Sequence, residues 1–294
     1  MTVSRQSTIS SPLSEVGRPL LKWAGGKRQL LPAILRRLPD QVDTYFEPFV
    51  GGGAVFFALA VERRFKRAVL SDQNEELILT YRTIQNNVGR VIELLGKMPH
   101  SEEAYYEIRA QRPRSPEKRA ARMIYLNRTG YNGLYRVNRS GQFNVPFGRY
   151  ARPNICDAER LVSVHKALAG VRLEVADFEQ LCSRARPGDA VYFDPPYVPV
   201  SSTARFAEYQ STPFGEPEHQ RLATLYQTLT ARGVQAVLSN SDTPLTRRLY
   251  RECSVDFVSA RRSINSAATG RGPTSELLVY QGSAPKRLCV GAAG

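Results

Sequence analysis

Hydrophobic positions along this chain occur in short runs that alternate with helical stripes. The short runs predict strands from Tyr45 and over 68–70, 172–175, 190–193 and 234–239. The stripes predict helices over 54–65, 74–97, 158–168 and 219–232. The last apolar segments, 257–262 and 276–280, are expected to pair as antiparallel strands. This alternation predicts an α/β fold with a doubly wound, Rossmann-like sheet that binds ligands at the carboxyl ends of its strands.

The segment between the second and third predicted strands has a different pattern. Ser101, and Ser115 followed by proline, are expected to cap two helices. From residue 130 to 150 aromatic, basic and turn residues alternate, and Asn138–Gly141 reads as the tip of a β-hairpin. We therefore predict a mostly helical insertion that carries a β-hairpin. The expected division of the chain is a disordered lead over 1–17, a catalytic domain over 18–75 and 155–283, a recognition domain over 76–154 and a tail over 284–294.

Charge adds a functional expectation for the insertion. The chain has 41 Lys and Arg against 27 Asp and Glu, a net charge of +14. Residues 97–152 hold 12 basic and 4 acidic residues, which is +8 over 56 positions. Such a field attracts polyanions, and this segment is the first candidate for a nucleic-acid surface.

Neither a membrane nor a metal partner is expected. The longest apolar run, 54–61, is much shorter than a membrane span, and residues 1–14 lack the apolar region of a signal peptide, so we expect a cytoplasmic protein. The four cysteines have no zinc-ligand spacing and the three histidines are scattered. We therefore expect reduced thiols and no metal centre.

Two turns at predicted strand ends carry candidate chemistry. Residues 47–53 read EPFVGGG, and Asp72 ends the next predicted strand. Glycines let a backbone approach a ligand closely, and an acid at this place can accept hydrogen bonds from ribose hydroxyls. A glycine turn of this kind occurs more often for packing than for nucleotide binding, so this motif alone is weak evidence.

The second turn is Asp194-Pro195-Pro196-Tyr197, directly after the strand at 190–193. The Asp194 carboxylate and the Pro195 carbonyl could accept both hydrogens of an exocyclic amine, which would direct its lone pair at an electrophile. Tyr197 offers a ring face on which an extruded base can stack. The turn therefore predicts methylation of an amine. A third segment, LKWAGGK at 21–27, places the only tryptophan, Trp23, in a polar loop beside Lys27, where a ligand face and a core anchor are equally good interpretations.

Together these motifs resemble the DNA adenine methyltransferase (Dam) family. LKWAGGK, EPFVGGG, LNRTGYNGLYRVNRSGQFNVPFGRY, DPPY, SNSDT and RRSI occur in this order between residues 20 and 281. The resemblance implies the α arrangement of motifs and methylation of adenine N6 in GATC with base flipping. It implies S-adenosylmethionine as cofactor, S-adenosylhomocysteine as product, and no metal. The matching cofactor positions are Trp23, Lys27, Phe49, Gly51, Gly53, Asp72, Asp177, Phe178 and Asp194.

The resemblance also implies contacts with double-stranded DNA. The matching positions are Arg128, Tyr131, Asn132, Leu134, Arg136, Asn144, Pro146 and Arg149. By residue type, Tyr131 could intercalate, and Arg136 and Arg149 could contact guanine edges. The basic residues of the helices preceding the hairpin suit phosphates: Arg109, Arg112, Arg114, Lys118, Arg119 and Arg122. Residues 205–214 are expected to form a lid.

Two other functions fit these residues. The tetrapeptide specifies an amine and not a polymer, so an amine of RNA or protein is an alternative substrate. A catalytically silent DNA-binding regulator could keep the same fold, although the intact tetrapeptide and glycine turn disfavour it. We expect a monomer, and a partner restriction endonuclease is compatible with the sequence.

Overall fold

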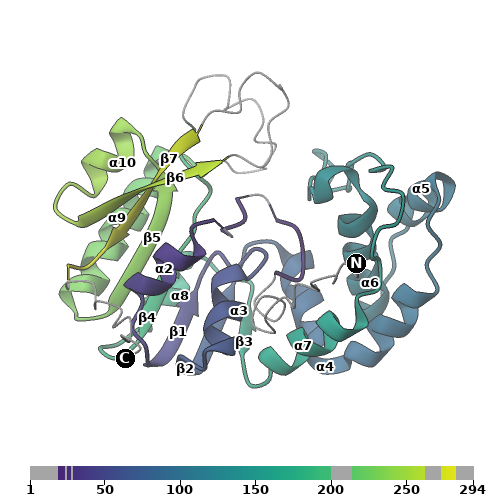
Figure 1. Cartoon of the computed structure of the whole chain (residues 1–294), viewed down its shortest axis with the longest axis horizontal. Coiled ribbons are helices and arrows are strands. Elements are labelled where there is room, and N and C mark those ends of the chain that lie inside the picture. The colour runs from purple at the N-terminus through teal and green to yellow at the C-terminus, as the bar shows by residue number, and fades with distance from the viewer. Residues whose placement is uncertain (1–18, 24, 28, 200–213, 262–272, 283–294) are drawn as a thin grey trace, which may run out of the picture.

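A single mixed sheet forms the centre of the computed structural model, which describes residues 19–23, 25–27, 29–199, 214–261 and 273–282. The strands run in the order β3-β2-β1-β4-β5-β7-β6 (Figure 1). β1 to β5 pair in parallel, whereas β7 is antiparallel to both β5 and β6. The predicted Rossmann-like sheet and its antiparallel final pair are confirmed. The strands are β1 Val42–Glu47, β2 Phe65–Ser71, β3 Arg172–Glu174, β4 Ala190–Phe193, β5 Gln235–Ser241, β6 Ser254–Arg261 and β7 Pro273–Tyr280.

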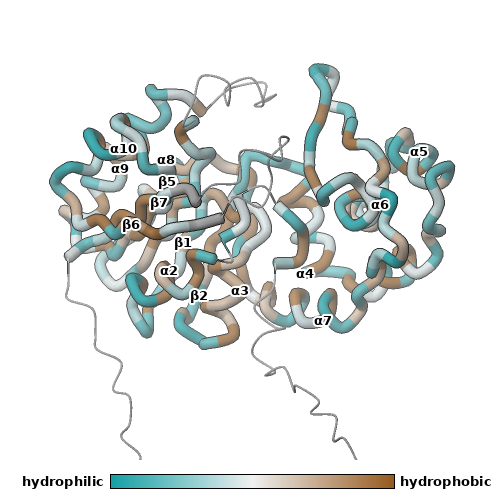
Figure 2. Tube along the Cα trace, turned by 45° about the horizontal axis from the view of Figure 1, so that its top comes forward, coloured by the Kyte–Doolittle hydropathy of each residue, from teal (hydrophilic) through white to brown (hydrophobic). Residues whose placement is uncertain are grey.

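Helices cover both faces of the sheet. Alternate strand residues point to opposite faces, so Tyr45 packs in one core and its neighbour Phe46 in the other. The Tyr45 face is covered by α2 (Leu31–Arg37), α3 (Ala54–Val61), α4 (Glu75–Gly96) and α7 (Ala158–Ala167). The Phe46 face is covered by α8 (Phe178–Cys182), α9 (Glu216–Ala231) and α10 (Pro244–Leu249). Figure 2 shows hydrophobic residues along the strands and hydrophilic ones on α9 and α10.

The insertion extends the Tyr45 face with α5 (Glu102–Ala110) and α6 (Pro116–Thr129), on the opposite side of the molecule from α9 and α10 (Figure 1). Both predicted caps are confirmed: Ser101 Oγ accepts the amide of Ala104 at 3.1 Å, and Ser115 Oγ accepts that of Lys118 at 3.3 Å. The hairpin is less regular than predicted. It consists of two isolated bridges, between residues 130 and 147 and between 137 and 143, closed by a turn at the predicted tip.

Two differences from the predicted elements have local causes. The helix after the glycine turn, α3, ends at Val61 and not at 65 as predicted, because Arg63 takes a positive φ of 53° and the chain turns into β2. The buried Arg64 stabilises this turn by donating to the Pro39 carbonyl at 3.0 Å. The short helices α2, α8 and α10 were not predicted, because five to seven residues are too few to show a helical period. The expected N-terminal lead and C-terminal tail, and all but Phe214 of the expected lid, lie outside the described residues.

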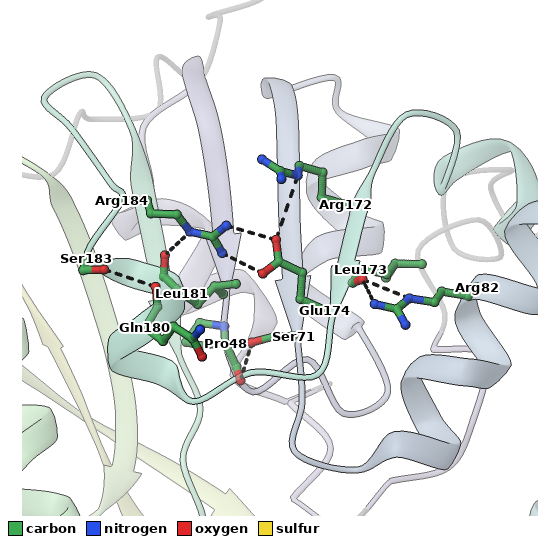
Figure 3. Close-up of polar contacts among 10 residues, drawn as sticks. All are labelled: Pro48, Ser71, Arg82, Arg172, Leu173, Glu174, Gln180, Leu181, Ser183 and Arg184. Atoms are coloured by element: carbon green, nitrogen blue, oxygen red, sulfur yellow. Dashed lines mark hydrogen bonds and ion pairs between the residues drawn. The ribbon is translucent and has the colours of Figure 1, made fainter.

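The β3 edge of the sheet is held by arginines (Figure 3). Arg82 of α4 donates to the Leu173 carbonyl at 3.0 Å. Glu174 receives two hydrogen bonds from Arg184, at 3.1 and 2.9 Å, and lies 3.9 Å from Arg172. These contacts fix the strand next to the loop that carries Asp72. Within the described ranges no helix is long and apolar enough to cross a membrane, and no group of three or more acidic, histidine or cysteine side chains could hold a metal ion.

Candidate active site and DNA-facing surface

The candidate active site lies where the order of the parallel strands reverses. β1 pairs with β2 on one side and with β4 on the other, with Phe46 opposite Val191. The turns that follow β1 and β4 therefore lie next to each other. This is the place where open α/β sheets bind ligands, and it brings the glycine turn and the Asp194 turn together.

The predicted cofactor residues of the glycine turn are in contact. Gly51 and Gly53 have positive φ angles of 46° and 72°. A Cβ on Gly51 would lie 2.7 Å from Cδ1 of Trp23, so only glycine leaves room for this ring. Asp72 accepts the Gly51 amide at 3.1 Å. Burial raises the pKa of Asp72, and the backbone amides of Asn74 and Gly51 oppose this shift.

An aromatic cluster lies beside this turn. The ring centroids of Phe49 and Phe178 are 5.6 Å apart, and Phe214 lies 5.7 Å from the first and 6.0 Å from the second. Asp177 caps α8, and its Oδ1 lies 3.0 Å from Nη2 of Arg221. The structure thus places Phe178 beside Phe49, while the Asp177 carboxylate already has partners in the protein. Its predicted contact with the cofactor stays a prediction.

The Asp-Pro-Pro-Tyr tetrapeptide at residues 194–197 contacts a buried lysine through its first and last residues. Nζ of Lys27 lies 2.8 Å from Oδ1 of Asp194 and 4.4 Å from the centroid of the Tyr197 ring. Only 5% of Lys27 is exposed. Ser239 of β5 donates to the same Asp194 oxygen at 3.1 Å. Burial raises the pKa of Asp194, whereas the Lys27 ammonium lowers it, so the lysine favours the carboxylate form that accepts hydrogen bonds.

The residues that hold the tetrapeptide were not predicted as site residues. Oδ1 of Asn240 accepts the Val198 amide at 3.1 Å, directly after the tetrapeptide. The Tyr197 hydroxyl donates to Oε2 of Glu276 at 2.7 Å. Asn240 is the last residue but one of β5, and Glu276 lies on β7. The only signal available in the sequence was that SNSDT and SELLVY lie at the ends of predicted strands. The turn is thus held from two neighbouring strands.

The predicted DNA contacts gather around the irregular hairpin. Tyr131 is 52% exposed, a large value for an aromatic residue, and its amide donates to the Pro146 carbonyl at 2.9 Å. Arg136 donates to Oδ1 of Asn144 at 2.7 Å. Positive φ angles of 54° and 51° turn the backbone at Asn132 and Arg149. The exposed members of the set are Tyr131, Asn132, Arg136, Pro146 and Arg149, and the half-buried ones are Leu134 and Asn144.

Several basic residues that were predicted to contact DNA form contacts within the protein instead. Arg128 donates to the Leu20 carbonyl at 2.9 Å, and burial lowers the pKa of its guanidinium. Arg119 forms an ion pair with Glu76, and Arg122 donates to the Ile108 carbonyl at 2.9 Å. Arg109 donates to the Val145 carbonyl at 3.0 Å. The exposed members of the predicted phosphate-binding set are Arg112, Arg114 and Lys118.

Asn127 of α6 connects the insertion to the segment that precedes the glycine turn, a role that was not predicted. Its Oδ1 accepts the Lys22 amide at 2.9 Å, and its Nδ2 donates to the carbonyls of Lys22 at 2.8 Å and Gly133 at 2.9 Å. Next to it, Trp23 stacks on Tyr135 with ring centroids 5.4 Å apart. The signal in the sequence was an amide within an otherwise apolar helix face.

Replacing Asn127 by alanine should lower the free energy of unfolding by about 2–3 kcal/mol, because three hydrogen bonds to backbone groups are lost in a buried place. Urea unfolding followed by circular dichroism measures this loss. Gln111→Ala, an exposed change in the same insertion, should leave the unfolding free energy nearly constant. Equal stability of Asn127→Ala and the wild type would contradict the connecting role.

A parallel sheet with a glycine turn after its first strand and an Asp-Pro-Pro-Tyr turn after the strand beside it is the arrangement of an amine methyltransferase. Residues 23–264 match the family described as D12 class N6 adenine-specific DNA methyltransferase, so the chain belongs to this family and to its class of enzymes. The predicted family and enzyme class are confirmed.

Proteins similar to this chain over most of its length include named methyltransferases. The chain is 40% identical over 272 residues to the Type II methyltransferase M1.LlaDCHI of Lactococcus lactis subsp. cremoris, covering 89% of this chain and 94% of the relative. It is 40% identical over 268 residues to the Type II methyltransferase M.MjaIII of Methanocaldococcus jannaschii, covering 84% and 93%. It is 38% identical over 267 residues to the DNA adenine methylase of Escherichia coli strain K12, covering 89% and 94%.

Proposed function

We propose that this protein transfers the methyl group of S-adenosylmethionine to N6 of an adenine that it flips out of duplex DNA, within the sequence GATC. The observation that carries this proposal is the position of the Lys27 ammonium. The Lys27 Nζ, which donates hydrogen bonds, lies 2.8 Å from the Asp194 carboxylate and above the Tyr197 ring. An adenine amine needs the same two features, an acceptor for its hydrogens and an aromatic face for its ring.

The residues around the glycine turn fit the proposed cofactor. The rings of Trp23 and Phe57 fill the space left by the missing side chains of Gly51 and Gly53, which shapes the turn, and the Asp72 carboxylate can accept ribose hydroxyls in addition to its two amide donors. The half-buried Phe49 offers apolar surface beside the turn and packs on the buried Phe178. When bound here, S-adenosylmethionine supplies an electrophilic methyl group.

The tetrapeptide prepares the amine for reaction. Asp194 and the Pro195 carbonyl accept its two hydrogens, which leaves the nitrogen lone pair free to attack. Tyr197 stacks on the base, and this stacking offsets part of the few kcal/mol that base flipping costs. Lys27 Nζ occupies the position over Tyr197 that the base would take, so it shifts aside as the base enters, while the two oxygens of Asp194 can accept from both nitrogens. The proton lost after transfer leaves to solvent, directly or through Asp194.

Recognition of DNA is assigned to the unit formed by residues 76–154, acting on double-stranded DNA as part of a monomer. Exposed Tyr131 inserts where the adenine leaves the stack. Arg136 and Arg149 read guanine edges, while exposed Arg112 and Lys118 bind phosphates. The name of the Escherichia coli relative, DNA adenine methylase, supports DNA as the polymer.

Tritium transfer from labelled S-adenosylmethionine tests the proposal on a GATC duplex, a duplex with the same bases scrambled, and an RNA of matching sequence. We expect counts in the GATC duplex alone. Equal counts in the scrambled duplex would overturn the recognition sequence, and counts in RNA would favour the alternative polymer. Binding of the GATC duplex without counts would favour a silent regulator.

Replacing Arg136 by alanine should relax sequence recognition. The loss of one bidentate contact to guanine costs about 1–3 kcal/mol of discrimination, or roughly ten- to a hundredfold in relative rate. The measurement compares kcat/KM on GATC with kcat/KM on duplexes that carry one substituted base pair. Arg139→Ala, an exposed change at the hairpin tip, should keep the wild-type ratio. An unchanged ratio in Arg136→Ala would exclude Arg136 from base recognition.

A further inference from the structure

Glu276 is the one acidic side chain of the described β7 segment, and it contacts the tetrapeptide. It lies in the sheet opposite Ser241 of β5 and Val258 of β6. Its Oε2 accepts the hydroxyl of Tyr197 at 2.7 Å. We propose that Glu276 is a positioning residue for methyl transfer: it fixes the Tyr197 ring in the orientation on which the target base stacks. This inference rests on the proposed function, which gives Tyr197 its role.

Two other contacts already hold the backbone and the acid of the turn. Ser239 donates to Asp194 at 3.1 Å, and Asn240 accepts the Val198 amide at 3.1 Å. Ser239 is also a side-chain hydrogen-bond partner of the Tyr197 hydroxyl, so Glu276 is the charged one of two partners at this end of the ring. A tyrosine ring that is anchored only through its Cα can still rotate about two torsions. The hydrogen bond to Glu276 adds a distant second anchor, which fixes the direction of the ring axis. Because a phenolic O–H lies in the plane of its ring, the direction of this bond also favours one ring plane.

The chemistry of Glu276 suits this task. A hydrogen bond to an ionised acceptor is shorter and roughly twice as strong as one between neutral groups. The same carboxylate raises the pKa of Asp194, after the larger effect of burial, so its charge opposes the catalytic acid. A carboxylate beside Asp194 is therefore electrostatically unfavourable for the folded protein, although Lys27 compensates for it in part. Orientation of Tyr197 explains its presence where stability does not.

Four variants test this role in steady-state methylation of the GATC duplex: Glu276→Ala, Glu276→Gln, Tyr197→Phe and the double variant Glu276→Ala/Tyr197→Phe. Glu276→Ala should lower kcat by about tenfold or more, with KM for the cofactor unchanged, because a hydrogen bond to a charged group is lost. Glu276→Gln keeps an acceptor and should stay within about threefold of the wild type. In the Tyr197→Phe background Glu276→Ala should add less than about twofold, because the two residues act as one unit.

Equal losses from Glu276→Ala in both backgrounds would overturn the positioning role, and so would an unchanged kcat in Glu276→Ala. A second readout does not depend on activity. In protein labelled with ¹³C at Cζ of tyrosine, the Tyr197 signal, assigned by its absence in Tyr197→Phe, should shift in Glu276→Ala. An unshifted signal would show that the contact does not exist. A wild-type protein that methylates no DNA would instead overturn the proposed function, while this spectrum still reports on the contact.

Discussion

Replacing Asp194 by alanine should reduce methyl transfer to a GATC duplex by about a thousandfold or more, since the main acceptor for the amine is lost. The structure gives a reason for a loss this large. The Asp194 carboxylate forms an ion pair with the Lys27 ammonium at 2.8 Å and accepts a hydrogen bond from the Ser239 hydroxyl at 3.1 Å. Its position is therefore fixed before any substrate arrives. A single-turnover assay with tritiated S-adenosylmethionine measures the rate.

DNA binding by Asp194→Ala should stay within about threefold of the wild type, because phosphate contacts supply most of the affinity and are proposed to lie on the insertion. Fluorescence anisotropy with a labelled duplex measures this binding. Asp194→Asn, which keeps the size of the side chain, should also be inactive. Asp43→Ala is the matched control, because Asp43 is an exposed acid at the start of β1 that pairs with Lys66. Activity of Asp194→Ala close to that of the wild type would refute the catalytic assignment.

Replacing Lys27 by methionine should move the acid limb of the pH–rate profile to higher pH. Burial raises the pKa of Asp194 and Lys27 is the largest influence that lowers it, so the pKa rises further when the ammonium is removed. Because the amine needs the carboxylate form, kcat at neutral pH should fall and should recover as the pH rises.

The profile is measured as kcat at saturating cofactor, so that a change in cofactor affinity does not enter. Lys27→Arg keeps a positive charge and should keep the acid limb near its wild-type position. An acid limb in Lys27→Met that coincides with that of the wild type would mean that another group sets the protonation of Asp194. An equal loss of kcat at every pH would mean that Lys27 acts without changing the protonation of Asp194.

The sequence allowed the parallel sheet and its carboxyl-end turns to be predicted, because strand and helix periods differ clearly in long segments. Ala190–Phe193 matches its predicted bounds, since an apolar run ends there at a charged residue. The helix after the glycine turn was predicted too long, because the apolar Phe65 belongs to the next strand and the intervening turn depends on Arg63 and Arg64. Those residues read as ordinary helical positions in sequence.

Contacts between distant segments could not be predicted. The Tyr197 hydroxyl forms a hydrogen bond with Glu276, which is 79 residues away in the sequence, and Lys22 forms one with Asn127, which is 105 residues away. No local pattern encodes such pairs, because they depend on strand order and on the packing of α6. The same reason applies to Arg119, Arg122 and Arg128. The sequence shows that these charges belong to the insertion, but it does not show what they contact. A long guanidinium side chain can bind carbonyls and carboxylates of its own chain as well as phosphates.

The segment from Lys22 to Lys27 touches both halves of the candidate site. Its backbone is held by Asn127 at the base of the hairpin, Trp23 lies between Gly51 and Tyr135, and Lys27 reaches Asp194. A ligand at the glycine turn and a duplex at the hairpin therefore act on the same few residues. We therefore expect their binding free energies to be linked, and such linkage is reciprocal. Whatever factor the cofactor contributes to the affinity for DNA, DNA contributes equally to the affinity for the cofactor.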